Sequence, residues 1–242
     1  MWPVALWRLL RVFGHILRGL LIVYWRMPGV DERQRMALTQ DWAARLLAAM
    51  GIELVVHGTP HAGAKLVVAN HISWLDIMAI DAVVPARFVS KAEVGRWPLV
   101  GKLVTAAGTL YLQRERRRDA MRVLGLMSQA LQQGSTVAVF PEGTTGSGHG
   151  VLPFHANLLQ AAIDAKVPIQ PVSLRYSDIS ESISSRAAYV GDTTLLQSLW
   201  WVVSSRGMTV HVTILAPQAV SHADRRSLAA SLQELVDSAI PG

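Results

Sequence analysis

Cysteine is absent from the 242-residue chain. Its absence excludes disulfide bonds, thiolate ligands for a metal ion and cysteine nucleophiles, and it leaves the cellular compartment open. Long apolar runs are absent too, because no stretch reaches the roughly 18 consecutive apolar residues that mark a membrane-spanning helix. The histidines carry no accompanying set of metal ligands, so we expect no metal site.

Charged residues are scarce, at 17% of the chain, whereas hydrophobic residues make up 51%. This composition is typical of a protein that lies on a membrane or buries an unusual amount of apolar surface. The 23 Lys and Arg outnumber the 17 Asp and Glu, which gives a net charge of +6. Basic proteins bind nucleic acid or anionic lipid. No zinc finger, RNP motif or basic zipper is present, so we expect lipid and not nucleic acid as the partner.

The first 27 residues predict an amphipathic helix that lies in a membrane interface. Arg8, Arg11, His15 and Arg18 recur at helical spacing among Leu, Ile, Val, Phe and Trp. An interfacial helix keeps Arg11 and Arg18 among lipid phosphates while its apolar face dips into the bilayer. A membrane span and a helix packed on its own domain are the alternatives. Residues 31–51 predict a second helix, so we expect a membrane-associated hairpin over 1–50 and an α/β domain over 51–242.

From residue 52, short β-rich runs alternate with helical patterns, which is typical of an α/β fold. We therefore expect a mixed, partly parallel sheet flanked by helices. The predicted strands are 52–58, 65–70, 87–90, 109–113, 135–140, 167–176 and 209–215. The predicted helices lie near 74–84, 97–106, 117–133, 156–166, 194–205 and 223–239. Residues 177–193 are polar and irregular.

Polar residues follow four of these strand runs. Asn70 ends the run at 65–70 and His71 comes next, and Lys91 follows the run at 87–90. Arg114 follows 109–113, and Glu142 follows 135–140 after Pro141. Ligands of α/β sheets bind beyond the carboxyl ends of the strands, so we expect these side chains to converge on one site.

His71 and Asp76 are five residues apart in "NHISWLD", an awkward spacing for a pair. Five steps along one helix place two side chains roughly 140° apart. Ser73 lies three residues before Asp76, which matches the capping-box pattern. If Ser73 caps a helix that holds Asp76 in its first turn, the bend before that helix can bring His71 over Asp76. A purely capping Asp76 and a structural His71 are the alternative interpretation.

Four blocks in order resemble the glycerolipid acyltransferase family, whose members acylate glycerol-3-phosphate and lysophospholipids. They are "NHISWLD" (70–76), "GTLYLQR" (108–114), "FPEGT" (140–144) and "VPIQPVSL" (167–174). The resemblance covers roughly 65–175. It implies that His71 is the general base and that Asp76 orients it. It also implies a substrate-binding set, which comprises Asn70, Lys91, Arg114, Glu142, Gly143 and Thr144.

The resemblance further implies transfer of an acyl group from a thioester to the hydroxyl of 1-acyl-glycerol-3-phosphate. The thioester, acyl-CoA or acyl carrier protein, would be a co-substrate, and no cofactor is expected. Membrane lipids would be partners, and the expected location is the cytoplasmic face of the inner membrane. The arginines at 116–118 predict a solvated basic rim, or a surface for anionic lipid or an acyl carrier protein. The oligomeric state is not defined.

One residue departs from the family's pattern. Many lysophosphatidate acyltransferases read E-G-T-R, but Thr145 stands here at the arginine's position. The acceptor site therefore loses one cation. We keep lysophosphatidate as the first acceptor and another lysolipid, such as lyso-ornithine lipid, as the alternative. Two other classes stay open: a catalytically silent scaffold, and a lipid hydrolase that uses His71 and Asp76 to activate water.

Overall fold

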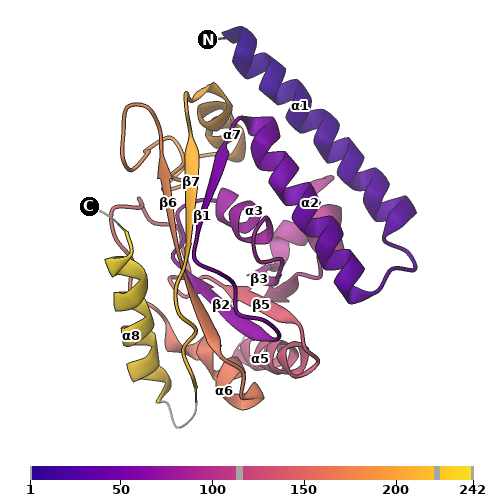
Figure 1. Cartoon of the computed structure of the whole chain (residues 1–242). Coiled ribbons are helices and arrows are strands. Elements are labelled where there is room, and N and C mark those ends of the chain that lie inside the picture. The colour runs from indigo at the N-terminus through magenta and orange to yellow at the C-terminus, as the bar shows by residue number, and fades with distance from the viewer. Residues whose placement is uncertain (1, 113–116, 221–223, 241–242) are drawn as a thin grey trace.

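The computed structural model describes residues 2–112, 117–220 and 224–240. Its centre is a seven-stranded sheet in the order β1-β7-β6-β2-β5-β3-β4, with helices on both faces (Figure 1). The strands are β1 (Glu53–His57), β2 (Lys65–Ala69), β3 (Arg87–Lys91), β4 (Leu110–Leu112), β5 (Thr136–Val139), β6 (Ile169–Ser177) and β7 (Thr209–Ile214). The helices are α1 (Trp2–Leu21), α2 (Glu32–Met50), α3 (Leu75–Asp81), α4 (Val100–Ala106), α5 (Arg117–Gln132), α6 (Gln160–Ala165), α7 (Leu195–Ser204) and α8 (Arg225–Ser238).

The sheet is mixed, as predicted. Strand β2 pairs in parallel with β5 and β6, and β3 pairs in parallel with β4 and β5. Strands β1 and β7 are parallel to each other, but β7 is antiparallel to β6. Strands β2 to β6 therefore run one way, and β1 and β7 run the other. All five residues of β2 are buried, as expected for a strand covered on both faces.

Two hydrophobic cores cover the two faces of the sheet. One core contains buried residues of α1, α2, α3 and α7, and the other contains buried residues of α5, α6 and α8. The N-terminal hairpin thus shares a core with α3 and α7. Helix α2 begins at a capping box, in which Asp31 and Gln34 bond each other's backbone N–H groups, and ends at Gly51 in the left-handed conformation.

Helix α1 uses two residues of its cationic stripe to contact α2 and the end of α7. Nη1 of Arg8 donates to the carbonyls of Val203 and Ser205, at 2.9 and 2.7 Å, where α7 ends. The buried His15 ring bonds the carbonyl of Trp42 at 2.9 Å. Arg8 and His15 therefore contact the protein, and the contact of Arg11 and Arg18 with lipid phosphates stays a prediction. Free carbonyls at the end of α7 favour a cation, and α1 supplies it.

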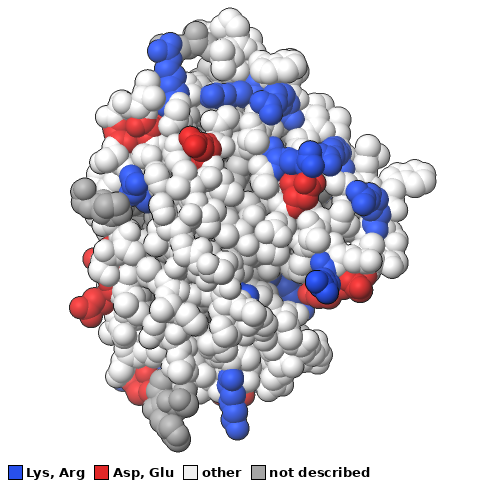
Figure 2. Space-filling model, viewed as in Figure 1, with Lys and Arg blue, Asp and Glu red and all other residues white. Residues whose placement is uncertain are grey.

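The apolar side of α1 faces outward, away from the rest of the domain. Its exposed large side chains are Trp2, Val4, Leu6, Trp7, Leu10, Phe13, Leu17 and Leu21. In Figure 2, basic side chains follow α1 in a diagonal band, and the outer edge of the helix is white. A surface helix of a soluble domain shows the reverse arrangement. Among the helices that the structure describes, none is long and apolar enough to cross a membrane.

Asp81, the last residue of α3, is a buried carboxyl. Its Oδ1 accepts a hydrogen bond from the backbone N–H of Ala86 at 3.0 Å. Burial raises the pKa of Asp81 to about 8, although the bond from Ala86 lowers it. The folded chain therefore holds a proton on Asp81 at neutral pH, where an unfolded chain has released it.

We expect Asp81→Asn to stabilise the protein at pH 7 by about 4 kcal/mol. Between pH 3.8 and about 8, the folded state binds one more proton at Asp81 than the unfolded state does. The free energy of unfolding of the wild type therefore falls by about 1.4 kcal/mol for each unit by which the pH rises. The amide cannot ionise and keeps the oxygen that accepts from Ala86. Urea unfolding at pH 5, 6 and 7 measures the free energy of unfolding of both proteins. Every other titrating group contributes equally to the two values and cancels in their difference. Equal pH slopes in the two proteins would contradict the prediction.

Candidate active site

The predicted site residues lie at the carboxyl ends of neighbouring parallel strands. Asn70 and His71 follow β2, Glu142 follows β5, and Lys91 is the last residue of β3. The order β2-β5-β3 makes these strands adjacent, so β2 and β3 are about 10 Å apart. Lys91 is exposed at that edge. Arg114 lies outside the residues that the structure describes.

Asn70 extends the sheet through its side chain. Its Nδ2 donates to the carbonyl of Leu174 at 2.9 Å, and its Oδ1 accepts from the N–H of Leu174 at 2.8 Å. The amide thus mimics a backbone pairing between the end of β2 and β6. With its side chain paired in this way, Asn70 sets the place where the main chain turns away from the sheet, at His71.

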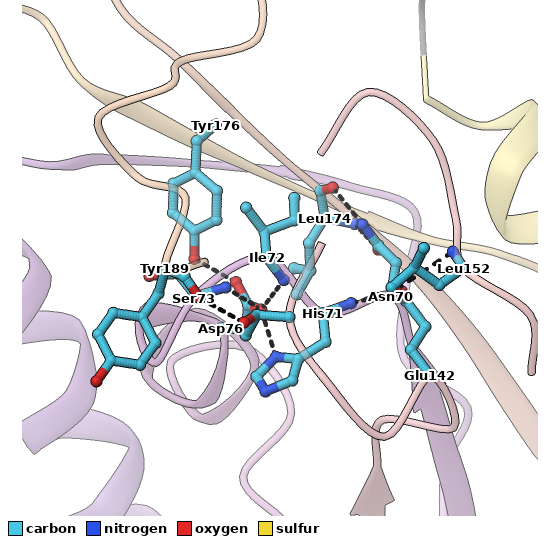
Figure 3. A network of polar contacts seen from close by, with 11 residues as sticks. Asn70, His71, Ile72, Ser73, Asp76, Glu142, Leu152, Leu174, Tyr176 and Tyr189 are labelled. Carbon is cyan, nitrogen blue, oxygen red and sulfur yellow. Dashed lines mark hydrogen bonds and ion pairs between the residues drawn. The ribbon is translucent and has the colours of Figure 1, made fainter. Parts of the chain in front are cut away.

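His71 and Asp76 form the pair that the sequence predicted. Nδ1 of His71 lies 2.8 Å from Oδ2 of Asp76 (Figure 3). His71 lies in the turn before α3, and Asp76 lies in the first turn of that helix. The bend therefore closes a distance that five helical steps would not.

The cap of α3 differs from the predicted capping box. The helix begins at Leu75, with Trp74 in the capping position. The hydroxyl of Ser73 is buried and has no partner among the described residues. Asp76 makes the cap alone: its Oδ2 accepts the N–H groups of Ile72 and Ser73 at 2.6 and 2.9 Å. Ser73 acts through its backbone, so the predicted side-chain cap is wrong.

The imidazole of His71 is held by Asp76 at Nδ1 and by an aromatic ring that stacks on it. It stacks on Phe140 with ring centroids 4.0 Å apart and 9° between the planes, and Phe140 in turn packs on Phe88. Its side chain keeps 20% of its surface exposed, whereas Asp76 has none. With Nδ1 held by Asp76, Nε2 has no hydrogen-bond partner among the described residues. This nitrogen is therefore free to act on a substrate.

Glu142 supports the turn that holds His71 from the neighbouring strand. Its Oε1 accepts the backbone N–H of His71 at 2.8 Å, and its Oε2 accepts the N–H of Leu152 at 3.3 Å. Burial raises the pKa of Glu142 to about 7, two backbone bonds lower it, and the charge of Asp76 raises it further. Sequence reasoning assigned Glu142 to the acceptor and did not foresee this bond to the backbone of His71. The acceptor-binding role stays a prediction.

The loop after Glu142 holds the turn around His71 in place. Gly143 adopts a φ of 71°, a conformation that glycine adopts freely, and Thr144 is exposed. The N–H of Gly146 donates to the carbonyl of His71 at 2.7 Å. Thr145 donates its hydroxyl to the carbonyl of Tyr189. Thr145 therefore serves as a tether for the irregular segment 178–193.

That segment is tied to the turn a second time, because the N–H of Tyr189 donates to the carbonyl of Ile72 at 2.9 Å. Sequence reasoning missed this contact, since nothing in residues 177–193 marks them as part of the site. It also missed Tyr176, whose hydroxyl donates to Oδ1 of Asp76 at 2.8 Å. Tyr176 closes an ordinary β-type run, and no pattern distinguishes it from a core residue. In the described parts of the chain, no group of three or more His, Cys, Asp or Glu could hold a metal ion.

Comparisons with known proteins identify the family. A family model described as Acyltransferase matches residues 53–175. A lyso-ornithine lipid O-acyltransferase of Pseudomonas aeruginosa is 36% identical over 96% of this chain and 92% of its own. A 1-acyl-sn-glycerol-3-phosphate acyltransferase of Neisseria gonorrhoeae is 39% identical over 88% of this chain and 86% of its own.

Among solved structures, the crystal structure of the 1-acyl-sn-glycerophosphate acyltransferase of Thermotoga maritima has the same fold. The TM-score is 0.67 at 22% identity, over 96% of this chain and 95% of that one. At this identity the likeness concerns the fold alone. The family match and the two relatives, each aligned over most of its length, carry the assignment further: the chain belongs to the acyltransferase family of enzymes.

Proposed function

We propose that this protein transfers a fatty acyl group from a thioester to the hydroxyl of a lysolipid, with His71 as the general base. The observation that carries the proposal is the arrangement of one imidazole. Asp76 holds Nδ1 of His71 at 2.8 Å, and Nε2 stays free where the parallel strands end. Acyl-CoA or an acyl carrier protein would supply the thioester.

The geometry supports a direct transfer between the two substrates. Because Nδ1 carries the proton and donates a hydrogen bond to Asp76, Nε2 is unprotonated and is the basic nitrogen. It removes the acceptor's hydroxyl proton as the oxygen attacks the thioester carbonyl. The tetrahedral intermediate then expels the thiolate as the C–S bond breaks, and the proton on His71 passes to the sulfur. The products are an ester and a free thiol, and His71 returns to its starting form.

For the acceptor we propose 1-acyl-glycerol-3-phosphate, with lyso-ornithine lipid or another lysolipid as the alternative. Relatives of both kinds match this chain at similar identity. Lys91, Arg114 and the loop 142–144 are the proposed headgroup and glycerol contacts. The alternative draws support from Thr145, which adds no charge and whose hydroxyl is engaged by Tyr189.

For the location we propose the cytoplasmic face of the inner membrane, where both thioester donors and the lipid acceptor meet. The outward apolar face of α1 supports a membrane contact through that helix. Arg11, which is exposed, would lie near anionic headgroups, whereas Arg8 serves the fold. A basic surface favours anionic lipid.

An acceptor panel tests the proposed reaction. Purified protein is incubated with an acyl thioester and, in turn, lysophosphatidate, lyso-ornithine lipid and a zwitterionic lysophospholipid. Free thiol and acylated product are both measured. We expect thiol and acylated acceptor to appear in equal amounts, with lysophosphatidate the best acceptor. Free fatty acid without acylated acceptor would identify a hydrolase, and no thiol with any acceptor would identify a silent scaffold.

A substitution at Thr145 tests what this position does to acceptor choice. We expect Thr145→Arg to raise kcat/KM for lysophosphatidate relative to lyso-ornithine lipid by roughly 10-fold, because a guanidinium can bond a phosphate in bidentate fashion. Thr145→Val is the matched control for losing the tether to Tyr189, and His149→Arg adds the same charge elsewhere on this loop. An unchanged ratio in Thr145→Arg would remove position 145 from headgroup selection.

A further inference from the structure

Tyr176 lies on β6 and contacts Asp76 of the His71–Asp76 pair. Its side chain is 1% exposed, and its hydroxyl donates to Oδ1 of Asp76 at 2.8 Å. Figure 3 shows the phenol on the far side of Asp76 from the His71 ring. Tyr176 therefore faces no substrate, and any effect on the reaction must pass through Asp76.

The hydrogen bonds to Asp76 are divided unequally between its two oxygens. Oδ2 accepts from Nδ1 of His71 and from the N–H groups of Ile72 and Ser73. Oδ1 accepts from Tyr176, and the described residues offer it no other donor. A buried carboxylate needs its oxygens bonded, so Tyr176 completes the set and fixes the plane of the carboxylate.

The same strand also holds the other end of the catalytic turn. Leu174, two residues before Tyr176 on β6, makes both hydrogen bonds to the amide of Asn70. Leu174 makes these bonds through its backbone N–H and carbonyl, and Tyr176 bonds Asp76 through its side chain, so β6 fixes both the residue before His71 and the partner of His71. The position of the imidazole thus depends on β6.

We propose that Tyr176 is a positioning residue, which holds Asp76 in the orientation that keeps the proton of His71 on Nδ1 and leaves Nε2 free as the base. This inference rests on the proposed role of His71. The tautomer of a histidine is set by the hydrogen bond that its other nitrogen makes. Without the bond to Tyr176 only Oδ2 is held, so the plane of the carboxylate can tilt and its alignment with Nδ1 weakens.

The phenol remains a donor throughout the working pH range. Burial raises the pKa of Tyr176 well above 10, and the charge of Asp76 together with their hydrogen bond raises it further. Tyr176 therefore neither ionises nor transfers a proton during turnover. Its contribution is orientation alone.

Tyr176→Phe tests the proposal, because it keeps the ring and removes only the hydroxyl. We expect kcat to fall roughly 10-fold, as for the loss of a hydrogen bond to a charged group, with KM unchanged. In protein labelled with ¹⁵N-histidine, NMR should show a smaller fraction of the Nδ1–H tautomer at His71. Ser177→Ala is the matched control: it removes the neighbouring hydroxyl, which bonds His211 at 3.0 Å, and both measurements should match the wild type.

Wild-type kcat and an unchanged tautomer in folded Tyr176→Phe would overturn the proposal. Should that variant not fold, the chain labelled with 3-fluorotyrosine replaces it, and the ¹⁹F signal of Tyr176 must shift in Asp76→Asn. A signal that does not shift would equally overturn the proposal. The NMR measurements need no turnover. An inactive wild type with the Nδ1–H tautomer would therefore count against the proposed function and leave the positioning by Tyr176 standing.

Discussion

We expect His71→Ala to lower kcat by roughly 10²- to 10⁴-fold, the range that general-base catalysis supplies. His71 follows β2, and its Nε2 has no hydrogen-bond partner among the described residues. Without the imidazole the acceptor hydroxyl would keep its proton and remain a poor nucleophile. Thiol release from an acyl thioester measures turnover. The folded state should be retained, because the ring of His71 is partly exposed and packs mainly on Phe140.

The comparison with Asp76→Ala sharpens this prediction. That variant should lose activity and stability together, because the N–H groups of Ile72 and Ser73 and the hydroxyl of Tyr176 lose their acceptor. Each buried group without a partner costs about 1–3 kcal/mol. Thermal unfolding therefore separates the two variants. His61→Ala, at an exposed histidine, is the control and should keep full activity. Wild-type turnover in His71→Ala would exclude the proposed mechanism.

The second large effect concerns the outward face of α1. We expect the combined change Leu10→Gln, Phe13→Gln and Leu17→Gln to lower binding to anionic phospholipid vesicles by roughly 10²- to 10³-fold. These side chains are 65%, 56% and 42% exposed, and half-insertion of each is worth about 1–1.5 kcal/mol. Glutamine preserves the helix. Sedimentation with vesicles measures the binding.

Two arginines one turn apart provide the discriminating controls. Arg11→Gln should weaken vesicle binding and its salt dependence, because Arg11 is exposed and each such cation adds about 1 kcal/mol. Arg8→Gln should lower stability and leave binding unchanged, since Arg8 bonds Val203 and Ser205. Met121→Glu, at an exposed apolar residue of α5, should change neither. If the triple variant sediments like the wild type, α1 is not the membrane contact.

The sequence predicted much of the fold because its signals are local. Asp31 and Gly51 bound α2 as a cap and a left-handed terminus, and the run at 65–69, which is apolar after Lys65, is a strand buried on both faces. The alternation of strands and helices predicted a partly parallel sheet. Residues after the strand runs then had to lie at one edge, because parallel strands end together. Asn70, His71 and Glu142 do so.

The orientation of α1 did not follow from the sequence. A polar stripe follows from the helical spacing of Arg8, Arg11, His15 and Arg18. This spacing alone does not predict whether the stripe contacts lipid, solvent or protein. The answer depends on the unpaired carbonyls at the end of α7, almost 200 residues away. The side-chain cap predicted at Ser73 is not made, because the N–H of Asp76 that its hydroxyl would accept donates to the carbonyl of Ser73 instead.

By itself, the sequence determined the alternation of strands and helices, the place of His71 in the turn before a helix and the presence of Asp76 in that helix. These features depend on residues a few positions apart. The tertiary structure decided which groups complete the site: Tyr176 behind Asp76, Leu174 beside Asn70 and the tether between Thr145 and Tyr189. The physical reason is that a buried carboxylate or amide must find donors and acceptors wherever the packing of β6 and of residues 178–193 brings them, and no local pattern records that choice.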